Sequence, residues 1–211
     1  MTRVDVRKTL QTLIANFPGK GAVELDRAED VLLATVLSAR TRDEQVLKVY
    51  PKLRREFPTL TSLARADVKK IEVPLKSIGL YHAKARAMKG IAQALLKNHG
   101  GKVPRTREAL VALPGVGRKT ANCVLAYAFR IPAIAVDTHV HRVTNRLGWL
   151  KTKRVEDTEQ ALYKVVPKDL WLSVNRVMVK FGRTVCLPGR PKCYDCPVAR
   201  WCRFPNKTPR P

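Results

Sequence analysis

The sequence predicts an all-α protein, and three observations support this prediction. Apolar residues recur at spacings of three and four along most of the 211-residue chain. No stretch alternates apolar and polar residues for long enough to build a sheet. Proline and glycine stand where the periodic segments would end as helices. With 45% hydrophobic residues, the chain can bury a substantial core in one or two domains.

Helices are expected to fill the first hundred residues. Asp26 would cap the second helix, with Glu29 completing a capping box. The third helix would start at Thr41 or Asp43 and be broken or kinked by Pro51. The other expected helical segments in this part are residues 10–17, which end at a Pro-Gly pair, the very apolar and therefore central 31–37, the short 59–64 and 66–71, and the long 81–98.

Three more helices are expected near the C-terminus. Thr138 would cap a helix that runs through Leu147, and two further helices fit residues 155–165 and 170–181. Residues 204–211 contain proline and lysine, and we expect this tail to be loosely held.

The segment LPGVGRKTA at residues 113–121 predicts a tight hairpin between two helices, residues 106–112 and 118–129. Pro114 cannot extend the first helix, because it has no amide hydrogen. The N–H groups at the start of the second helix would point outward and favour an anion. On a basic protein that anion is most naturally a phosphate of a nucleic acid. The candidate phosphate contacts here are Gly115, Val116, Gly117 and Arg118.

The net charge of +24 predicts a polyanionic partner. The chain has 41 lysines and arginines against 17 acidic residues, and its pI is near 10.4. These basic residues are spread along the chain instead of lying on one amphipathic helix, so a membrane surface is a poorer partner. No apolar run approaches the roughly 18 residues that span a bilayer. No signal peptide is evident, and we expect a soluble, intracellular protein.

Four cysteines near the C-terminus have metal-site spacing. Cys186, Cys193, Cys196 and Cys202 follow the pattern C-x6-C-x2-C-x5-C, while Cys123 lies in an apolar helical pattern that predicts core packing. Two disulfides would need an oxidising compartment, and nothing else in the sequence indicates secretion. The spacing fits a structural zinc site or a four-iron cluster about equally well. Either group would help to fold a segment that is poor in apolar residues.

Lys119 and Asp137 are the candidate catalytic residues. Lys119 lies on the first turn of the helix after the hairpin, where the helix dipole, Arg118 and partial desolvation would each lower the pKa of its amine. A neutral amine is a nucleophile. Apart from this position, Lys119 would be interpreted as one of 41 basic side chains on a solvated surface. Asp137 follows an apolar run and precedes a helix, where an aspartate is most often a helix cap but can also be catalytic.

The hairpin, the segment VDTHVHR at 136–142 and the cysteine pattern together resemble endonuclease III of the helix-hairpin-helix superfamily, over about residues 32–202. The resemblance implies an all-α, two-domain helix-hairpin-helix DNA glycosylase fold with a DNA-binding cleft. Residues 21–132 would form a six-helix domain containing the hairpin. Residues 1–20 and 133–211 would form a discontinuous helical domain, in which the four cysteines hold a [4Fe-4S] cluster.

The resemblance also implies an activity in base-excision DNA repair. The chain would bind double-stranded DNA, remove oxidised pyrimidines and cut the abasic site by β-elimination. It would act as a monomer in a prokaryotic cytoplasm, at the nucleoid. Lys119 would form the Schiff base and Asp137 would be the catalytic aspartate. A sister branch that removes adenine opposite oxidised guanine typically lacks this lysine and has an extra C-terminal domain. The alternative is a DNA-binding module of the same fold with little or no catalysis.

Three further residues are expected to contact the DNA. Leu80 matches the family's wedge loop, although a leucine in this setting would otherwise be taken for core. Arg40 departs from the glutamine that is common in the family, and it would either contact a phosphate or fill the gap left by a flipped base. His139 would line the lesion pocket, unless it is an ordinary surface or capping residue at a helix start.

Overall fold

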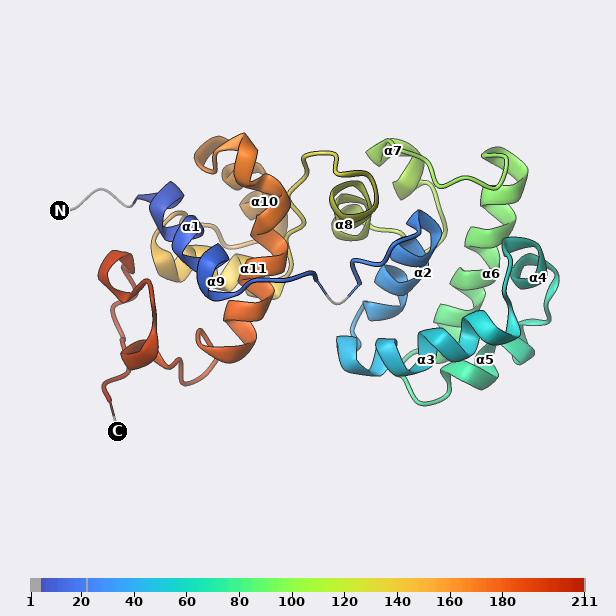
Figure 1. The fold of residues 1–211 in the computed structure, drawn as a ribbon, viewed down its shortest axis with the longest axis horizontal. Helices are drawn as coiled ribbons and strands as arrows, with labels where there is room; N and C mark the ends of the chain where they lie inside the picture. Colours follow the sequence, from blue (N-terminus) through green and yellow to red (C-terminus); the bar gives the residue numbers. More distant parts are fainter. Residues whose placement is uncertain (1–4, 22, 211) are drawn as a thin grey trace. The chain divides into compact units, whose positions relative to one another are not determined.

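The structure is a computed structural model that describes residues 5–21 and 23–210. Every regular element in this part of the chain is a helix (Figure 1), which confirms the all-α prediction. Within the same residues, no helix is both long enough and apolar enough to cross a membrane.

The chain forms two compact units. One is the continuous unit Gly21–Arg130. The other is the discontinuous unit, in which the N-terminal segment up to Lys20 joins Ile131–Pro211. The hairpin therefore belongs to the continuous unit, and the cysteines belong to the discontinuous one.

The continuous unit is built around helices α2 (Ala28–Ser38) and α6 (Tyr81–Asn98). Helix α2 is buried at every position from Val31 to Leu37, as its apolar composition predicted, and it packs on α8. The long helix α6 buries Met88, Ile91 and Leu95 and packs on α4 and α5. The helices of this unit are α2 Ala28–Ser38, α3 Asp43–Glu56, α4 Leu60–Arg65, α5 Val68–Leu75, α6 Tyr81–Asn98, α7 Arg107–Val111 and α8 Arg118–Phe129.

Two local features of this unit differ from what the sequence predicted. Asp26 does not cap α2, which begins at Ala28 with Arg27 at the N-cap position and no side-chain cap. Helix α3 is not broken at Pro51, which lies inside it, and ends only at Glu56. Both differences arise from tertiary packing, which local sequence signals do not report.

The discontinuous unit packs α1 and α9 against α11 around a shared core. Leu10 and Leu13 of α1 are fully buried, and the rings of Phe17 and Phe181 stack at a tilt with their centroids 5.5 Å apart. The helices here are α1 Val6–Asn16, α9 Thr138–Leu147, α10 Val155–Val165 and α11 Trp171–Thr184, with short 3-10 turns η1 Lys168–Leu170, η2 Cys193–Asp195 and η3 Ala199–Trp201.

The segment that leads into α9 is buried and held by side chains of the same unit. Residues 133–136 have no regular secondary structure and are buried. The Tyr163 hydroxyl accepts a hydrogen bond from the Ile134 N–H at 3.1 Å. The Asn175 amide donates to the Ala135 carbonyl at 2.9 Å. These two contacts fix the backbone just before Asp137.

Candidate functional site

The hairpin forms where it was predicted. Thr106 caps α7, the Val116 N–H closes a turn onto the Leu113 carbonyl at 3.1 Å, and α8 follows with Gly117 as its N-cap residue. Gly115 has a φ of 73°, a left-handed conformation that suits glycine. A Cβ added at Gly117 would meet nothing within 4 Å, so this turn is open to a partner.

The predicted contacts of the hairpin divide into open and buried ones. Gly115, Gly117 and Arg118 are exposed. Val116 is only 5% exposed, and its N–H serves the turn itself. Val116 thus holds the shape of the hairpin, whereas its three neighbours are the predicted contacts that remain exposed.

Helix α6 packs closely against the hairpin. A Cβ built on Gly90 would approach Pro114 Cγ to 3.1 Å, and one built on Gly115 would approach Ala87 Cβ to 3.1 Å. The small residues on both sides therefore allow a close approach of helix and turn. This tight packing holds the hairpin rigidly on the longest helix of the unit.

Lys119 is the second residue of α8, directly after the hairpin, and its side chain is half-buried. The first turn of a helix presents unpaired N–H groups and the positive end of the dipole, so an anionic group of a ligand is favoured beside this amine. The hairpin would thus bring a phosphate and the Lys119 amine to the same end of α8.

Asp137 is the N-cap residue of α9. Its Oδ1 accepts hydrogen bonds from the N–H groups of His139 and Val140, each at 2.9 Å. The prediction that Thr138 caps this helix is therefore wrong, since Thr138 is its first residue. Asp137 is half-buried, at the end of the segment fixed by Tyr163 and Asn175.

His139 is half-buried beside α11. Its Nδ1 lies 3.2 Å from Arg142 Nη2, and a Cβ built on Gly182 would come within 2.9 Å of the same ring atom. Burial lowers the pKa of His139, opposed by the nearby charge of Asp137. This histidine is thus packed into the discontinuous unit next to Asp137, and is not a freely solvated side chain.

Two arginines of α9 bind the cysteine segment. Arg142 donates to the carbonyl of Cys186 from Nε at 3.2 Å and from Nη2 at 2.9 Å. One turn later, Arg146 Nη1 lies 3.6 Å from Cys186 Sγ and donates to the Leu187 carbonyl at 2.6 Å. No role was predicted for either residue, although two arginines spaced four apart on the helix after Asp137 lie on one helix face.

The four predicted metal ligands lie together. Cys186, Cys193, Cys196 and Cys202 are all free thiols, and they line one cavity of the discontinuous unit. Among the described residues, no three side chains of the usual ligand types stand close enough together to bind a single ion. Four thiols around one cavity fit the donor set of an iron–sulfur cluster, in which thiolates are the protein's ligands. Cys123 is buried in α8, as predicted.

Burial raises the pKa of Cys196 to about 11 and also raises the pKa of Cys202. Without a metal these thiols stay protonated near neutral pH, so ligation would displace their protons.

The surroundings of the four cysteines contain several hydrogen-bond donors and cations. The Arg146 guanidinium lies over the Phe204 ring at 4.6 Å, and Lys207 donates to the Ala199 carbonyl at 3.0 Å. The C-terminal tail, expected to be loosely held, thus makes contacts with this segment.

Two of the predicted DNA contacts are exposed and have unusual backbone conformations. Leu80 is 57% exposed and has a φ of 60° at the N-cap of α6. Arg40 is exposed and has a φ of 54°. For residues other than glycine such angles cost free energy, and they are commonly found at functional sites. An exposed leucine at such a position is not a core residue.

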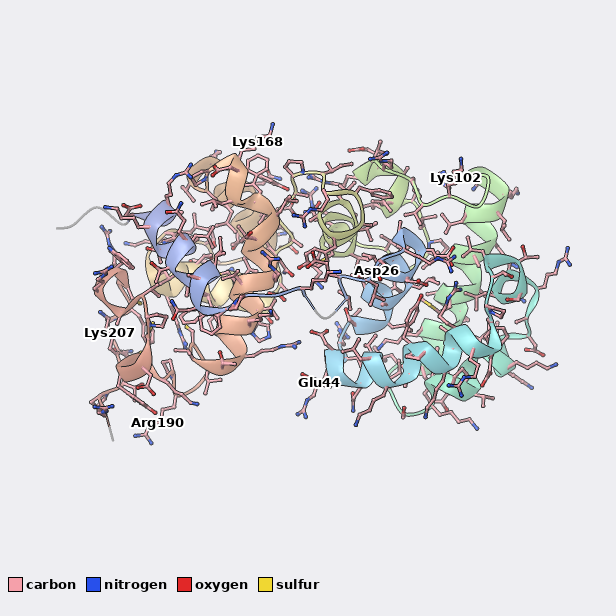
Figure 2. The ribbon with its side chains drawn as sticks, in the orientation of Figure 1. Asp26, Glu44, Lys102, Lys168, Arg190 and Lys207 are labelled. Carbon is pink, nitrogen blue, oxygen red and sulfur yellow. The ribbon has the colours of Figure 1, made fainter. Side chains whose placement is uncertain are left out.

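Basic side chains occur over both units. Figure 2 shows Lys102 next to the C-terminal end of α6, Lys168 between α10 and α11, and Arg190 and Lys207 on the segment after α11. Arg190, Lys192 and Tyr194 are exposed and line a shallow pocket in that segment. This distribution agrees with a net charge of +24 spread along the sequence.

Comparisons with known proteins agree with this geometry. A family model described as HhH-GPD superfamily base excision DNA repair protein matches residues 33–168. Endonuclease III of Thermotoga maritima is 48% identical over 174 residues, which cover 82% of each chain. Endonuclease III of Escherichia coli is 40% identical over 178 residues, which cover 84% of each chain.

Solved structures match over nearly the whole chain. A trapped endonuclease III–DNA covalent intermediate superposes with a TM-score of 0.90 at 38% identity, covering 97% of each chain. A thermostable thymine-DNA glycosylase superposes with a TM-score of 0.81 at 27% identity, covering 94% of each chain. A hairpin beside a lysine, an aspartate at the start of a helix and four clustered thiols thus accompany a close match in sequence and fold. The chain belongs to the endonuclease III family, within the HhH-GPD superfamily of base excision DNA repair proteins.

Proposed function

We propose that the chain is a bifunctional DNA glycosylase and AP lyase that removes oxidised pyrimidines from duplex DNA through a Schiff base on Lys119. The single observation that carries this proposal is the place of Lys119, half-buried on the first turn of α8 behind an open hairpin. The structural match to an endonuclease III trapped in a covalent DNA intermediate supports it. Because a damaged base is unreachable inside the stack, it must first be flipped out of the duplex.

The chemistry follows from an amine and a carboxylate. The neutral Lys119 amine attacks C1′ of the deoxyribose, and the bond from C1′ to the base breaks, with its electron pair leaving on the base. The carboxylate of Asp137 stabilises positive charge on the sugar, or takes and returns the proton of the amine. The C1′–O4′ bond of the sugar then opens, with O4′ taking up the proton that the nitrogen releases, and this leaves an imine between Lys119 Nζ and C1′. The imine makes a C2′ proton acidic. Loss of that proton expels the phosphate on the 3′ side and cuts the strand.

Each unit contributes a defined part of this mechanism. The exposed glycines and Arg118 of the hairpin would hold a backbone phosphate at the start of α8. Asp137 uses Oδ1 to cap α9, which fixes the orientation of its carboxyl group. We further propose that the continuous unit is the helix-hairpin-helix domain and the discontinuous unit the iron–sulfur domain.

The four cysteines would hold the [4Fe-4S] cluster of that domain. When bound, the cluster cross-links the segment from Cys186 to Cys202 and needs no redox change for the bond-breaking steps. Iron and sulfide analysis with visible absorbance separates it from zinc. Cys196→Ser should lose iron, whereas Cys123→Ser, at the one cysteine outside the group, should keep it.

Borohydride trapping tests the central step. The wild-type protein with an abasic-site duplex and borohydride should give a covalent protein–DNA adduct, and Lys119→Ala should give none. Lys102→Ala, which removes an exposed lysine outside the hairpin, serves as the matched control and should trap normally. A wild-type protein that binds the duplex but forms no adduct would reduce the function to DNA binding alone.

A further inference from the structure

Lys84 is a buried lysine that the proposed chemistry does not use. It lies in the first turns of α6 and is only 5% exposed. Its ammonium group donates a hydrogen bond to the hydroxyl of Thr41, in the segment between α2 and α3. Taking a charged amine out of water costs free energy, and a neutral hydroxyl compensates for little of it. A methionine would fill the same space without that cost, so packing alone does not account for a lysine here.

The hydrogen bond joins the two segments that carry Arg40 and Leu80. Arg40 directly precedes Thr41, and the carbonyl of Leu80 accepts the backbone N–H of Lys84 at 3.0 Å. In the described part of the chain, three residues other than glycine have a positive φ, and these are two of them. The third, Arg130, is an ordinary left-handed residue at the end of a helix. The bond thus links two segments that each carry an exposed residue with a strained backbone conformation.

We propose that Lys84 is a positioning residue, which fixes the spacing between Arg40 and Leu80 and so determines how well the enzyme extracts a base from the duplex. An exposed leucine can enter a base step, and an exposed arginine can contact a base edge or a phosphate. Both must reach the duplex together if one is to stabilise the distortion that the other makes. This inference rests on the function proposed above.

The same helix shows why the effect should be selective. Further along α6, Ala87 and Gly90 pack tightly against Gly115 and Pro114 of the hairpin. Loss of the contact between Lys84 and Thr41 would release the segment at Arg40, while the hairpin keeps its support. Phosphate binding and the reactivity of Lys119 should therefore persist, and only the extraction step should suffer.

Paired variants test the contact. Lys84→Met and Thr41→Val each remove it with little change in volume, and Thr41→Ser retains the hydroxyl. Lys97→Met is the matched control, because it removes an exposed lysine from the other end of the same helix. The substrates are a duplex that contains thymine glycol next to 2-aminopurine, whose fluorescence rises on unstacking, and a single-stranded oligonucleotide with an abasic site.

We expect Lys84→Met and Thr41→Val to slow single-turnover base release from the duplex by on the order of tenfold to a hundredfold, and to reduce the 2-aminopurine signal. Borohydride trapping on the single-stranded abasic site, which needs no extraction, should match the wild type. Thr41→Ser and Lys97→Met should behave like the wild type in both assays. A cooperative thermal unfolding transition, measured for each variant, serves as the check that it is folded. If Lys84→Met proves unfolded, Thr41→Val alone decides the matter.

Two results would overturn the inference. One is base release at the wild-type rate in both Lys84→Met and Thr41→Val. The other is a parallel loss of single-strand trapping, which would give Lys84 a chemical or general structural role. Failure of the proposed function is seen separately, because the wild-type protein itself would then form no adduct. That outcome also removes the inference.

Discussion

The guanidinium of Arg142 binds the carbonyl oxygen of Cys186 through two nitrogens, Nε at 3.2 Å and Nη2 at 2.9 Å. The same Nη2 donates to the Gly182 carbonyl at 2.8 Å and lies 3.2 Å from His139 Nδ1. Helix α9 therefore begins at the cap residue Asp137 and is tied, five residues later, to the first cysteine of the cluster segment. The side chain of Arg142 thus connects the cluster segment directly with His139, in the first turn of α9.

Arg142→Met should destabilise the discontinuous unit. The change leaves the carbonyls of Cys186 and Gly182 without their charged donor, and we expect the free energy of unfolding to fall by about 2–3 kcal/mol. Urea denaturation measures that loss, and iron content per chain should fall with it. Arg190→Met removes an exposed arginine from the same segment and should change neither. Equal stability of the two variants would show that the Arg142 contacts contribute little.

Substitutions at Asp137 should separate capping from catalysis. Asparagine is also a good N-cap residue, so Asp137→Asn should keep the free energy of unfolding within about 0.5 kcal/mol of the wild type. Asp137→Ala loses the cap and should cost about 1 kcal/mol. Both should reduce base release on the order of 10²-fold or more while DNA binding is retained. Base release at the wild-type rate in Asp137→Asn would leave this residue with capping alone.

The helices that the sequence predicted best are those bounded by strong local signals. The range predicted for α6, residues 81–98, and the range predicted for α8, residues 118–129, are the ones that the structure shows. Glycines flank these helices, at positions 79, 100 and 101 around α6 and at the N-cap position 117 of α8, and helix ends marked by glycine can be read from local sequence. The close grouping of four thiols was likewise predictable, because they lie within seventeen residues of one another.

Helix α3 shows where local rules fail. Pro51 lies on its exposed face, so its ring needs no space in the core. A residue other than proline at this position would donate its N–H to the carbonyl of Leu47, a residue that is 46% exposed, so the missing hydrogen bond lies on the exposed face of the helix. On the opposite face Val46, Val49 and Leu53 are buried and hold the helix together. Packing therefore outweighs the proline, and no local signal reveals that.

The start of α2 depends on a contact across helices. Glu29 and Asp30 form ion pairs with Arg54 of α3, rather than completing a capping box with Asp26. The contacts of Arg142 and Lys84 are equally remote in sequence, since each reaches a partner more than forty residues away. Such partners follow from the fold and cannot be read from the residues alone.

Gly148→Ala should loosen the cluster segment. Gly148 ends α9 with a φ of 77°, and a Cβ there would lie 2.7 Å from Arg203 Cβ, next to Cys202. The strained conformation and the displaced arginine should together cost about 1–3 kcal/mol. Thermal unfolding and the rate of iron loss to a chelator measure the effect. Gly189→Ala is the matched control, because its new Cβ meets nothing within 4 Å. Similar losses in both variants would contradict the role of the contact.

Lys84 should give stability a distinct pH dependence. Burial lowers the pKa of Lys84 below its ordinary value of 10.5. Between the lowered pKa and 10.5 the unfolded chain binds more protons than the folded one, so stability rises with pH in that window. Below the window, the cost of burying the charge is fully present.

The measurement is the free energy of unfolding of the wild type and Lys84→Met, by urea, from pH 7 to pH 10. The advantage of Lys84→Met over the wild type should be largest at pH 7 and should shrink as the pH approaches 10. Lys97→Met, which removes an exposed lysine of the same helix, corrects for the general effect of losing one positive charge. An advantage that stays constant over this range would mean that the Lys84 amine keeps access to water in the folded protein, and that its bond to Thr41 costs little to maintain.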